Sequence, residues 1–405
     1  MKFKGLPDVN WESVLGRTIV ESQCRGKDHP LWKRIFSCFI CQKQEYQIVS
    51  DANSSILCFQ SFYERKSFND QLDNFAKLSN ADIIKGCKPL RNRFCGFLFL
   101  VNRIIPWYVE LRKFKQPVWL TLWLLKDLIY LNNVYNYFNN IDISRYKLLV
   151  TFCDSILDEA YVTELFKAHN IKTASLQHGQ YTAFRENKFI NSGVEIRTLK
   201  SDYLLAWNEM TLEECKRQGN VNSKIVICGI LGYIGKKYAS CVNPNNKVFG
   251  VVINHPFFEN DNVTLIKSAN LLAKAIGYNY YLKLHPNYPE DHFSNIVDND
   301  FYLSNIQKGI PILEYANKCE FSLVSSSSVF CELVYVRHRV LRYSTHQLDD
   351  KFKDVPYGLT FSCIDDVVMS YNKGFKDEDI DMLFSYLCGT EEVTREYKKF
   401  LTSFE

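Results

Sequence analysis

From Tyr146 onward the chain alternates short apolar segments with longer amphipathic ones. The apolar segments are typical of buried strands, and the segments between them repeat apolar residues at helical spacing. Such alternation favours a parallel sheet whose strands are joined by right-handed helical crossovers. Predicted strands of a first array lie at 147–152, 173–176, 203–206 and 224–228, with helices at 158–169 and 209–218.

A polar, turn-rich stretch with the sequence SCVNPNNK interrupts the pattern at 240–247. The alternation then restarts, with strands predicted at 248–253, 280–284, 302–303, 321–324 and 340–343, and helices at 263–276, 310–316 and 329–336. Two such arrays joined by a linker predict two Rossmann-like domains that face each other. The tail at 377–404 has amphipathic helical spacing, and we expect it to cross back to the first domain.

The first part of the chain is less regular. Residues 1–51 are predicted to be irregular with helical patches, and the first clear strand is at 54–62, followed by a polar helix that ends near Asn80. Apolar and aromatic residues at 94–138 predict two or three helices, separated at Pro106 and Pro117. The predicted domains are 1–240, with a helical aromatic and basic insert at about 88–140, then 246–376, then helices at 377–405.

Composition is that of an ordinary globular protein, with 46% hydrophobic and 23% charged residues. A net charge of +4 is too small for a nucleic-acid-binding protein, so we expect no nucleic-acid partner. The insert is the local exception, because it has many basic residues and almost no acids, which suits an anionic membrane surface. These basic residues are Arg91, Arg93, Arg103, Arg112, Lys113, Lys115 and Lys126.

Tryptophans within the same insert have two interpretations. Trp107, Trp119 and Trp123 either lie at a membrane interface or belong to the core of a long helix. No segment reaches the ~20 uninterrupted apolar residues that span a bilayer. Fourteen cysteines behind a start without an apolar signal segment predict reduced thiols, so we expect a cytoplasmic protein, with a peripheral place on the inner face of the cytoplasmic membrane left open.

Four consecutive serines are the main candidate for an anion site. They stand between a predicted strand and a predicted helix, where unpaired backbone N–H groups and the helix dipole favour a phosphate. Glu332 follows Ser328 by one helical turn and can accept hydrogen bonds from both hydroxyls of a ribose, or it is a solvated surface residue. The four serines are Ser325, Ser326, Ser327 and Ser328.

A second polar loop follows the predicted strand at 280–284. Pro286 restricts this loop, so the imidazole of His285 can hold one orientation toward a phosphate or a base. Lys283 has the alternating spacing that places it on the same face as His285. Glu314 is a second candidate for contact with the base or the ribose of a nucleotide.

A third polar loop follows the predicted strand at 173–176 and reads Gln177, His178, Gly179, Gln180 and Tyr181. Imidazoles titrate near neutral pH, so His178 suits the removal of a proton from a hydroxyl, although a histidine that caps a loop carbonyl fits equally well. Gly179 would allow a close ligand or a positive φ.

Asp154 lies just past the predicted strand at 147–152. Its position favours a cap on the helix that follows, because a carboxylate there accepts a hydrogen bond from the first helical N–H groups. The alternative is a catalytic role, either as the base or as the group that orients the acceptor.

Four motifs occur in a fixed order along the chain: strand-QHG, strand-KLHP, the helix ILEYA and strand-SSSS-xxxE. In this order they resemble the bacterial GT-B glycosyltransferases of surface polysaccharide synthesis. That family includes capsule and lipopolysaccharide transferases, and the CDP-glycerol glycerophosphotransferases are similar at a greater distance. The resemblance covers roughly 146–343. It implies a GT-B fold, an α/β architecture of two facing Rossmann-like domains with parallel sheets. By its motifs, the loop at 177–181 of the first domain would be near the acceptor, with His178 near the chemistry. The donor nucleotide would be held by the second domain, near His285, Ser326, Ser327 and Glu332.

Some family features are absent from this sequence. The acidic-acidic-Gly motif of many bacterial sialyltransferases is missing, which argues against sialic acid transfer. Gln180 and Tyr181 stand where glycerophosphotransferases usually have proline, which argues against a polyol-phosphate donor. Asp298 and Asp300 form a DxD pattern away from any predicted strand end, so we expect no metal and no cofactor, with helix-end N–H groups stabilising the leaving diphosphate.

The sequence therefore predicts an inverting, metal-independent glycosyltransferase. Its partners would be a nucleotide-sugar donor and a hydroxyl of a surface polysaccharide or a lipid-linked glycan. A glycerol- or ribitol-phosphate transferase on the same fold and a non-catalytic nucleotide- or glycan-binding protein stay open as alternatives.

Overall fold

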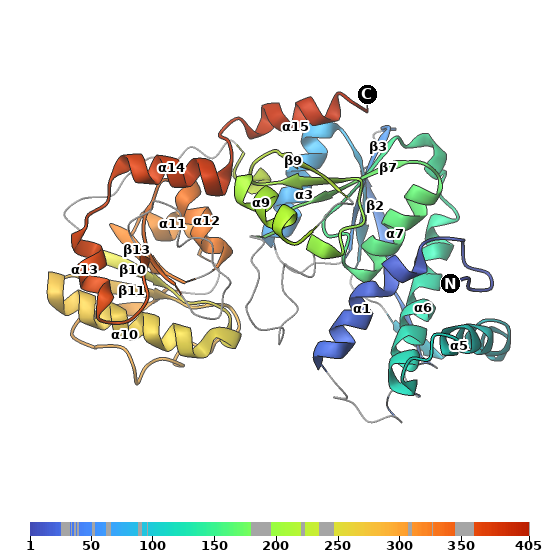
Figure 1. The fold of residues 1–405 in the computed structure, drawn as a ribbon, viewed down its shortest axis with the longest axis horizontal. Coiled ribbons are helices and arrows are strands. Elements are labelled where there is room, and N and C mark those ends of the chain that lie inside the picture. Colours follow the sequence, from blue (N-terminus) through green and yellow to red (C-terminus); the bar gives the residue numbers. More distant parts are fainter. Residues whose placement is uncertain are drawn as a thin grey trace.

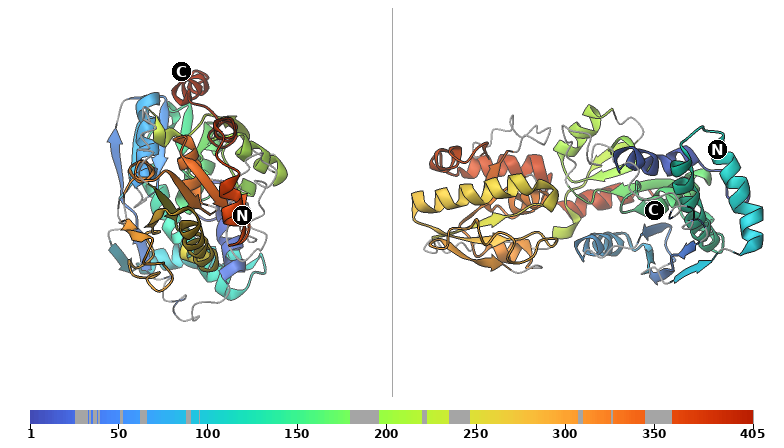
Figure 2. Two further views of the ribbon diagram at one scale, coloured as in Figure 1. Left: turned by 90° about the vertical axis from the view of Figure 1, so that its left-hand side faces the viewer. Right: turned by 90° about the horizontal axis from the view of Figure 1, so that it is seen from below.

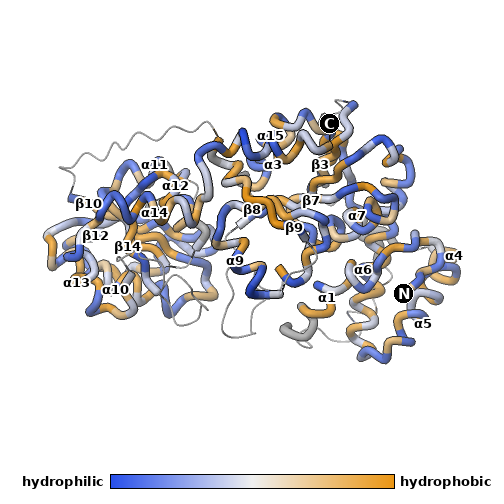
Figure 3. Tube along the Cα trace, turned by 45° about the horizontal axis from the view of Figure 1, so that its top comes forward, coloured by the Kyte–Doolittle hydropathy of each residue, from blue (hydrophilic) through white to orange (hydrophobic). Residues whose placement is uncertain are grey.

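The computed structural model describes residues 1–25, 33, 35, 38, 40–50, 53–61, 66–87, 91–94, 96–179, 196–219, 223–234, 247–306, 310–325, 327–344 and 360–404. These residues form two α/β lobes that lie side by side, each built around one large sheet (Figure 1). Apolar residues concentrate in the strands at the centre of each lobe, as the hydropathy colouring of β8 (Tyr203–Ala206) and β9 (Lys224–Ile227) illustrates (Figure 3). Within the described ranges, no helix is both long enough and apolar enough to cross a membrane.

The first sheet has seven strands, and all neighbours are parallel except β2 (Tyr46–Ser50) and β4 (Asp82–Gly86), which are antiparallel. Alternate residues of its strands face opposite layers of helices, as strand geometry requires. Leu57 and Phe59 of β3 pack with α1 (Trp11–Arg25), α6 (Val118–Phe138) and α7 (Leu157–Ala168). Ile56 and Cys58 pack with α3 (Lys66–Ser79) and α15 (Val393–Leu401). The sheet order is β2 (Tyr46–Ser50), β4 (Asp82–Gly86), β3 (Ile56–Gln60), β6 (Leu148–Thr151), β7 (Lys172–Leu176), β8 (Tyr203–Ala206) and β9 (Lys224–Ile227).

Several elements at the start of the chain differ from the prediction of irregular structure there. Residues 1–51 contain α1 and β2, and also β1 (Ile40–Lys43), which pairs antiparallel with β5 (Arg91–Phe94). The strand β4 was missed because its sequence, DIIKG, has only a short apolar run and begins with an acid. Long-range pairing rather than local pattern makes these segments into strands.

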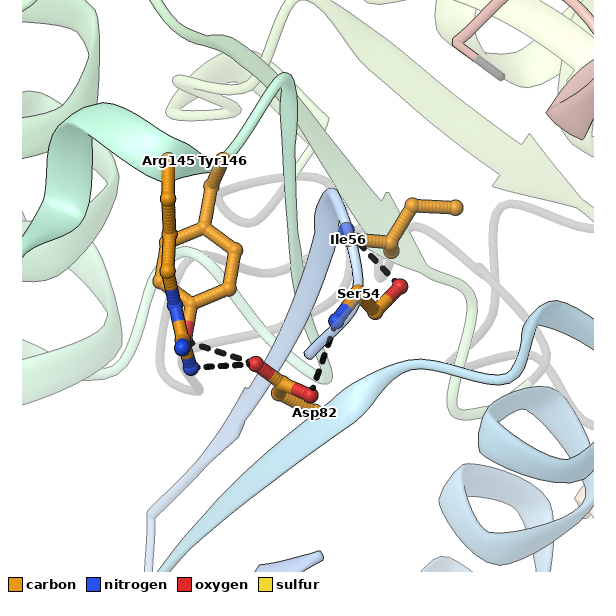
Figure 4. A network of polar contacts seen from close by, with 5 residues as sticks. All are labelled: Ser54, Ile56, Asp82, Arg145 and Tyr146. Atoms are coloured by element: carbon orange, nitrogen blue, oxygen red, sulfur yellow. Dashed lines mark hydrogen bonds and ion pairs between the residues drawn. The ribbon is translucent and has the colours of Figure 1, made fainter. Parts of the chain in front are cut away.

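The acid that begins β4 anchors the amino ends of three strands. Asp82 is buried, and its Oδ1 accepts a hydrogen bond from the Ser54 N–H at 3.2 Å. Its Oδ2 accepts from Arg145 Nη2 at 2.5 Å and from the Tyr146 hydroxyl at 3.0 Å, while Ser54 Oγ accepts from the Ile56 N–H (Figure 4). Because every partner lies at the start of β3, β4 or β6, this network fixes the edge opposite to the strands' carboxyl ends.

The second sheet has six parallel strands. On one face, Phe249 stacks on Phe321 at 5.1 Å between ring centroids, and Phe321 contacts Tyr371 of α13 (Asp366–Asn372). On the other face lies α11 (Ile312–Ala316), whose Tyr315 covers Gly250. A Cβ at Gly250 would lie 2.2 Å from the Tyr315 hydroxyl, so this packing requires glycine. The order is β12 (Tyr302–Ile306), β11 (Asn279–Lys283), β10 (Val248–Val252), β13 (Phe321–Val324), β14 (Arg339–Tyr343) and β15 (Thr360–Phe361).

Further helices complete the second lobe. The helix α10 (Glu259–Ile276) packs against α13, and α12 (Ser328–Tyr335) contacts both α11 and α14 (Asp377–Cys388). In the view from below, α10 runs along the length of this lobe (Figure 2).

The chain passes from one lobe to the other between α14 and α15. The helix α14 belongs to the core of the second sheet and α15 to the core of the first (Figure 1). Gly389 stands between them with a φ of 79°, and a Cβ there would lie 2.3 Å from the Trp207 carbonyl oxygen. The Asn208 amide donates to the Leu387 carbonyl, and the Tyr386 hydroxyl donates to Glu213 at 2.9 Å. These contacts join the end of α14 to the first lobe.

The insert begins with β5 and continues as helices. An arm of α4 (Phe97–Phe99), a π-helical turn (Leu100–Ile104) and α5 (Ile105–Arg112) packs on the long helix α6. The prediction that Pro106 interrupts the helical segment is wrong. Pro106 lies in the first turn of α5, where proline is tolerated because its missing N–H is not needed. Trp107 is fully buried and Trp119 packs on the same core, so for these two residues the core interpretation is confirmed.

Candidate active site

The strand order of the second sheet marks one edge as the place for a ligand. The chain runs from β10 outward to β11 and β12 and then returns to β13 on the other side of β10. In open parallel sheets, ligands bind at the carboxyl ends of the strands where the order reverses in this way. Val252 of β10 pairs with Lys283 of β11 and with Val324 of β13, so the three strands end at the same level.

The serine turn, residues 325–328, begins at this reversal. Ser325 follows β13 directly, is 1% exposed, and its Oγ has no hydrogen-bond partner among the described residues. Ser327 caps α12, since its Oγ accepts from the Val329 N–H at 3.4 Å. Ser328 is the first residue of α12, and Ser326 lies outside the described residues. A buried hydroxyl at a helix N-terminus is suited to donate to an anion.

Lys283 and Glu332 are brought together at the same edge. Lys283 Nζ donates to the Ile310 carbonyl at 2.8 Å and lies 6.0 Å from the centre of the Tyr315 ring. Burial lowers the pKa of Lys283, and the negative charge of Glu332 opposes this shift. Glu332 is therefore near a cation and half-buried, rather than a solvated surface residue.

Glu314 does not join this pair. It lies exposed on α11 and forms an ion pair with Lys318, one helical turn away, at 3.4 Å. The Glu314 carboxylate is thus solvated and ion-paired, so the structure offers no support for contact between Glu314 and a nucleotide.

Two histidines stand together after β10 and β11. The rings of His255 and His285 have centroids 5.0 Å apart and are nearly perpendicular. In each ring Nδ1 accepts a backbone N–H, from Phe257 at 3.2 Å and from Asn287 at 3.3 Å respectively. A neutral imidazole whose Nδ1 accepts carries its proton on Nε2, so His285 Nε2 is a suitable donor to a phosphate oxygen or a base. His255 Nε2 instead lies 3.1 Å from the Asn287 side-chain amide nitrogen, which ties the two loops together.

His255 was missed at the sequence level, although a signal was present. Asn254-His255-Pro256 follows β10 just as Leu284-His285-Pro286 follows β11. Only the parallel pairing of β10 with β11 shows that the two His-Pro steps meet.

Arg342 is a second residue that sequence reasoning missed. It pairs with Val324 in the sheet, is almost fully buried, and its guanidinium lies 5.0 Å from the centre of the Phe330 ring in α12. It thus adds a positive charge next to the serine turn, and guanidinium is the side chain best suited to phosphate oxygens. The signal is an arginine inside the apolar strand RVLRY.

In the first lobe, Gln177 shapes the loop that follows β7. Its Nε2 donates to the Gly179 carbonyl at 2.7 Å, and its Oε1 accepts from the Trp207 N–H at 2.8 Å. Its own N–H donates to the Leu205 carbonyl of β8. Gln177 is therefore buried in a positioning role, and it holds the segment that carries His178 at the carboxyl end of the sheet.

His178 is half-buried against two phenylalanine rings. Its centroid lies 5.9 Å from that of Phe68 and 5.5 Å from that of Phe152. Gly179 does not have the positive φ considered from sequence, and a Cβ there would meet no described atom within 4 Å. Among the described residues there is therefore room for a Cβ at this position, and no backbone strain requires a glycine.

The remaining two residues of this loop, Gln180 and Tyr181, lie outside the described residues.

Asp154 does not cap the helix after β6. The cap of α7 is Ile156, without a side-chain hydrogen bond. Asp154 instead accepts from the backbone N–H groups of Lys200 at 2.9 Å and Ser201 at 2.7 Å. The predicted cap is wrong because the Asp154 carboxylate binds these two N–H groups, which lie just before β8, instead of those in the first turn of α7.

A buried acidic cluster occupies the reversal point of the first sheet, between β3 and β6. Asp158 accepts from the Ser61 hydroxyl at 2.5 Å and from the hydroxyls of Tyr46 and Tyr130, each at 3.1 Å. Burial raises the pKa of Glu159, which accepts backbone N–H groups at the same place. Both carboxylates accept hydrogen bonds from the ends of β3 and β6, so the structure gives them a role in joining these two strands.

Comparison with known proteins gives the fold. No family model matches the chain, and no curated protein is similar in sequence. The UDP-GlcNAc 2-epimerase of Methanocaldococcus jannaschii, solved with UDP-GlcNAc and UDP, is 13% identical, with a TM-score of 0.52 over 86% of this chain and 99% of that chain. The UDP-GlcNAc 2-epimerase of Neisseria meningitidis, bound to UDP-GlcNAc, is 11% identical, with a TM-score of 0.53 over 86% and 98%.

At these identities the likeness concerns the fold alone. Together with the parallel sheets, it confirms the predicted architecture of two Rossmann-like α/β domains in the GT-B arrangement.

Proposed function

We propose that this protein is a glycosyltransferase that moves a sugar from a nucleotide-sugar donor to a hydroxyl of a bacterial surface polysaccharide or lipid-linked glycan. The observation that carries the proposal is the serine turn, where the buried Ser325 hydroxyl and the N-terminus of α12 meet at the reversal point of the second sheet. The fold supports it, since solved proteins of similar fold hold UDP-GlcNAc and UDP.

The donor diphosphate would lie at the serine turn. Backbone N–H groups at the start of α12, the Ser325 hydroxyl and the nearby charge of Arg342 would stabilise the leaving diphosphate in place of a metal ion. Glu332 would accept the ribose hydroxyls from the next turn of α12, where the positive charge of Lys283 is near it. His285 would donate from Nε2 to a phosphate oxygen or to the base.

The reaction would take place between this edge and the loop of His178. The acceptor oxygen attacks the anomeric carbon while His178 takes the hydroxyl proton. The bond between that carbon and the diphosphate oxygen breaks, and its electron pair leaves with the nucleoside diphosphate. Attack from the face opposite the leaving group inverts the anomeric configuration. The support for His178 is its place at a strand end of the first sheet, on a loop that Gln177 fixes.

A nucleotide-sugar epimerase is the second candidate, favoured by the names of the two solved proteins of similar fold. The two activities differ in their need for an acceptor. The product of such an epimerase is again a nucleotide sugar, inverted at one sugar carbon, whereas a transferase releases nucleoside diphosphate when an acceptor hydroxyl is present.

The test begins with a thermal-shift panel of UDP, GDP, CDP, CMP and dTDP. A ligand at 100 times its dissociation constant adds about 2.7 kcal/mol of apparent stability, enough for a clear shift. The matching nucleotide sugar is then incubated with and without a membrane extract as the acceptor source. Acceptor-dependent release of nucleoside diphosphate is the expected result. Conversion of the sugar without an acceptor would assign the epimerase, and binding without any product would assign a non-catalytic protein.

A further inference from the structure

The arm formed by α4, the π-helical turn and α5 has an exposed apolar face. Four of its side chains follow one another at a spacing of four residues, which places them on one side of a helix. A fifth, Leu98, adjoins the first of them. The exposed fractions are 76% for Phe97, 73% for Leu98, 43% for Val101, 49% for Ile105 and 55% for Val109.

The opposite side of the same arm is buried. Ile104, Trp107 and Leu111 belong to the core that α5 shares with α6. The arm is thus anchored to the first lobe without using its outer apolar residues. A soluble helix normally presents polar residues to water on its outer side, so a contiguous apolar outer face indicates a binding surface.

The charged residues beside this apolar face indicate what kind of partner binds it. Residues 96–118 contain four cations and one acid, Glu110, which is ion-paired with Lys113. Arg112, Lys113 and Lys115 are exposed at the end of α5, adjoining the apolar residues. An apolar strip with a cationic border matches the acyl chains and the anionic headgroups of a membrane leaflet.

A second copy of the chain matches this surface less well. In a symmetric dimer the same surface meets itself, and the one acid of residues 96–118, Glu110, is already paired with Lys113, so this segment offers no free anionic partner to the α5 cations of a second copy. The arm also lies at the end of the molecule farthest from the second sheet (Figures 1 and 2), so a flat surface can approach it without meeting the second lobe.

We propose that this face binds an anionic lipid bilayer, with the five apolar side chains at the boundary of headgroups and acyl chains and the α5 cations among the headgroups. The apolar residues differ from the tryptophans that the sequence suggested, because Trp107 lies in the core, whereas the α5 cations are among the basic residues that the sequence indicated. Lipid binding by this face does not depend on the proposed transfer reaction, and it can be measured without a donor or an acceptor.

The test uses vesicles of phosphatidylcholine alone or mixed with phosphatidylglycerol, co-sedimented with the full chain at low and high salt. Binding should require phosphatidylglycerol and weaken with salt. The double variant Phe97→Ser with Leu98→Ser should lower the partition coefficient by roughly 100-fold, because two large apolar side chains no longer enter the interface. The double variant Arg112→Gln with Lys115→Gln should lower it by roughly 25-fold, about fivefold for each charge.

The matched control removes two exposed apolar residues from the second lobe, as Met369→Ser with Met382→Ser, which are 58% and 44% exposed. It should bind vesicles as the wild type does. All variants change exposed side chains, so an unaltered unfolding midpoint shows that they fold. Equal binding by the Phe97 and Leu98 variant would overturn the proposal, as would binding indifferent to phosphatidylglycerol. A wild-type dimer that this variant dissociates would assign the face to a second copy instead.

Discussion

Acidic pH should destabilise the second lobe, because its folded state keeps one histidine buried and neutral. His338 lies just before β14, and its Nε2 is 2.9 Å from the Ser322 hydroxyl of β13, the strand that leads into the serine turn. Burial, with the nearby charge of Arg339 as a smaller cause, lowers the pKa of His338 to about 4, from an ordinary value of 6.5. The imidazole of His338 is therefore neutral in the folded protein at neutral pH.

The sign and size of the change in stability follow from this shift in the pKa of His338. Between pH 6.5 and 4 the unfolded chain binds a proton at His338 that the folded protein does not, so the free energy of unfolding falls as the pH falls. Each unit of pKa is worth 1.36 kcal/mol, so this residue alone should remove about 2 kcal/mol of stability by pH 5 and about 3 kcal/mol by pH 4. About one unit above pH 6.5 its contribution becomes constant.

Urea unfolding at pH 7.5, 6.0 and 5.0 measures the effect in the wild type and in His338→Gln, which cannot be protonated. His169→Gln is the control, because His169 is exposed at the end of α7. We expect the pH dependence to be smaller by about 2 kcal/mol in His338→Gln and unchanged in the control. The reasoning is refuted if His338→Gln loses stability on acidification as steeply as the wild type.

Three further changes test other parts of the structure. Gly389→Ala should lower the free energy of unfolding by about 1–3 kcal/mol because it combines a left-handed φ with a clash at a backbone carbonyl, whereas Gly374→Ala, with a similar φ and open space, should cost less in the same thermal melts. Asp82→Asn should cost about 1–3 kcal/mol in urea titrations because it weakens the bond with Arg145, and an unchanged midpoint would contradict that anchoring role. His178→Ala should reduce turnover by about 10²- to 10⁴-fold while nucleotide affinity stays the same, and near wild-type turnover would exclude it as the base.

The local pattern was sufficient for most of the fold. Strands and helices predicted between 146 and 343 are confirmed within a few residues, because each has the apolar spacing of its type and a turn at its end. The strands β2 and β4 were not predictable in this way. They are held by pairing and by a carboxylate whose partner, Arg145, is 63 positions away from Asp82.

The site was less predictable than the fold, since it depends on the order of strands. The serine turn and His285 could be picked out because each follows an apolar strand. The juxtaposition of His255 with His285 requires that β10 and β11 be neighbours, and the place of Arg342 requires the pairing of β13 with β14. Local sequence does not contain these pairings. The roles of the site residues stay predictions until they are tested.

The most direct test of the donor site is calorimetric titration of the matching nucleotide into the wild type, Ser325→Ala and Ser385→Ala. Ser385 is an exposed serine of α14 and serves as the control. Because the Ser325 hydroxyl is buried without a partner among the described residues, alanine there should leave the free protein equally or more stable. It should nevertheless weaken nucleotide binding by about 10- to 100-fold, the value of one hydrogen bond to a charged group. An unchanged dissociation constant for Ser325→Ala, or no binding of any nucleotide by the wild type, would contradict the account.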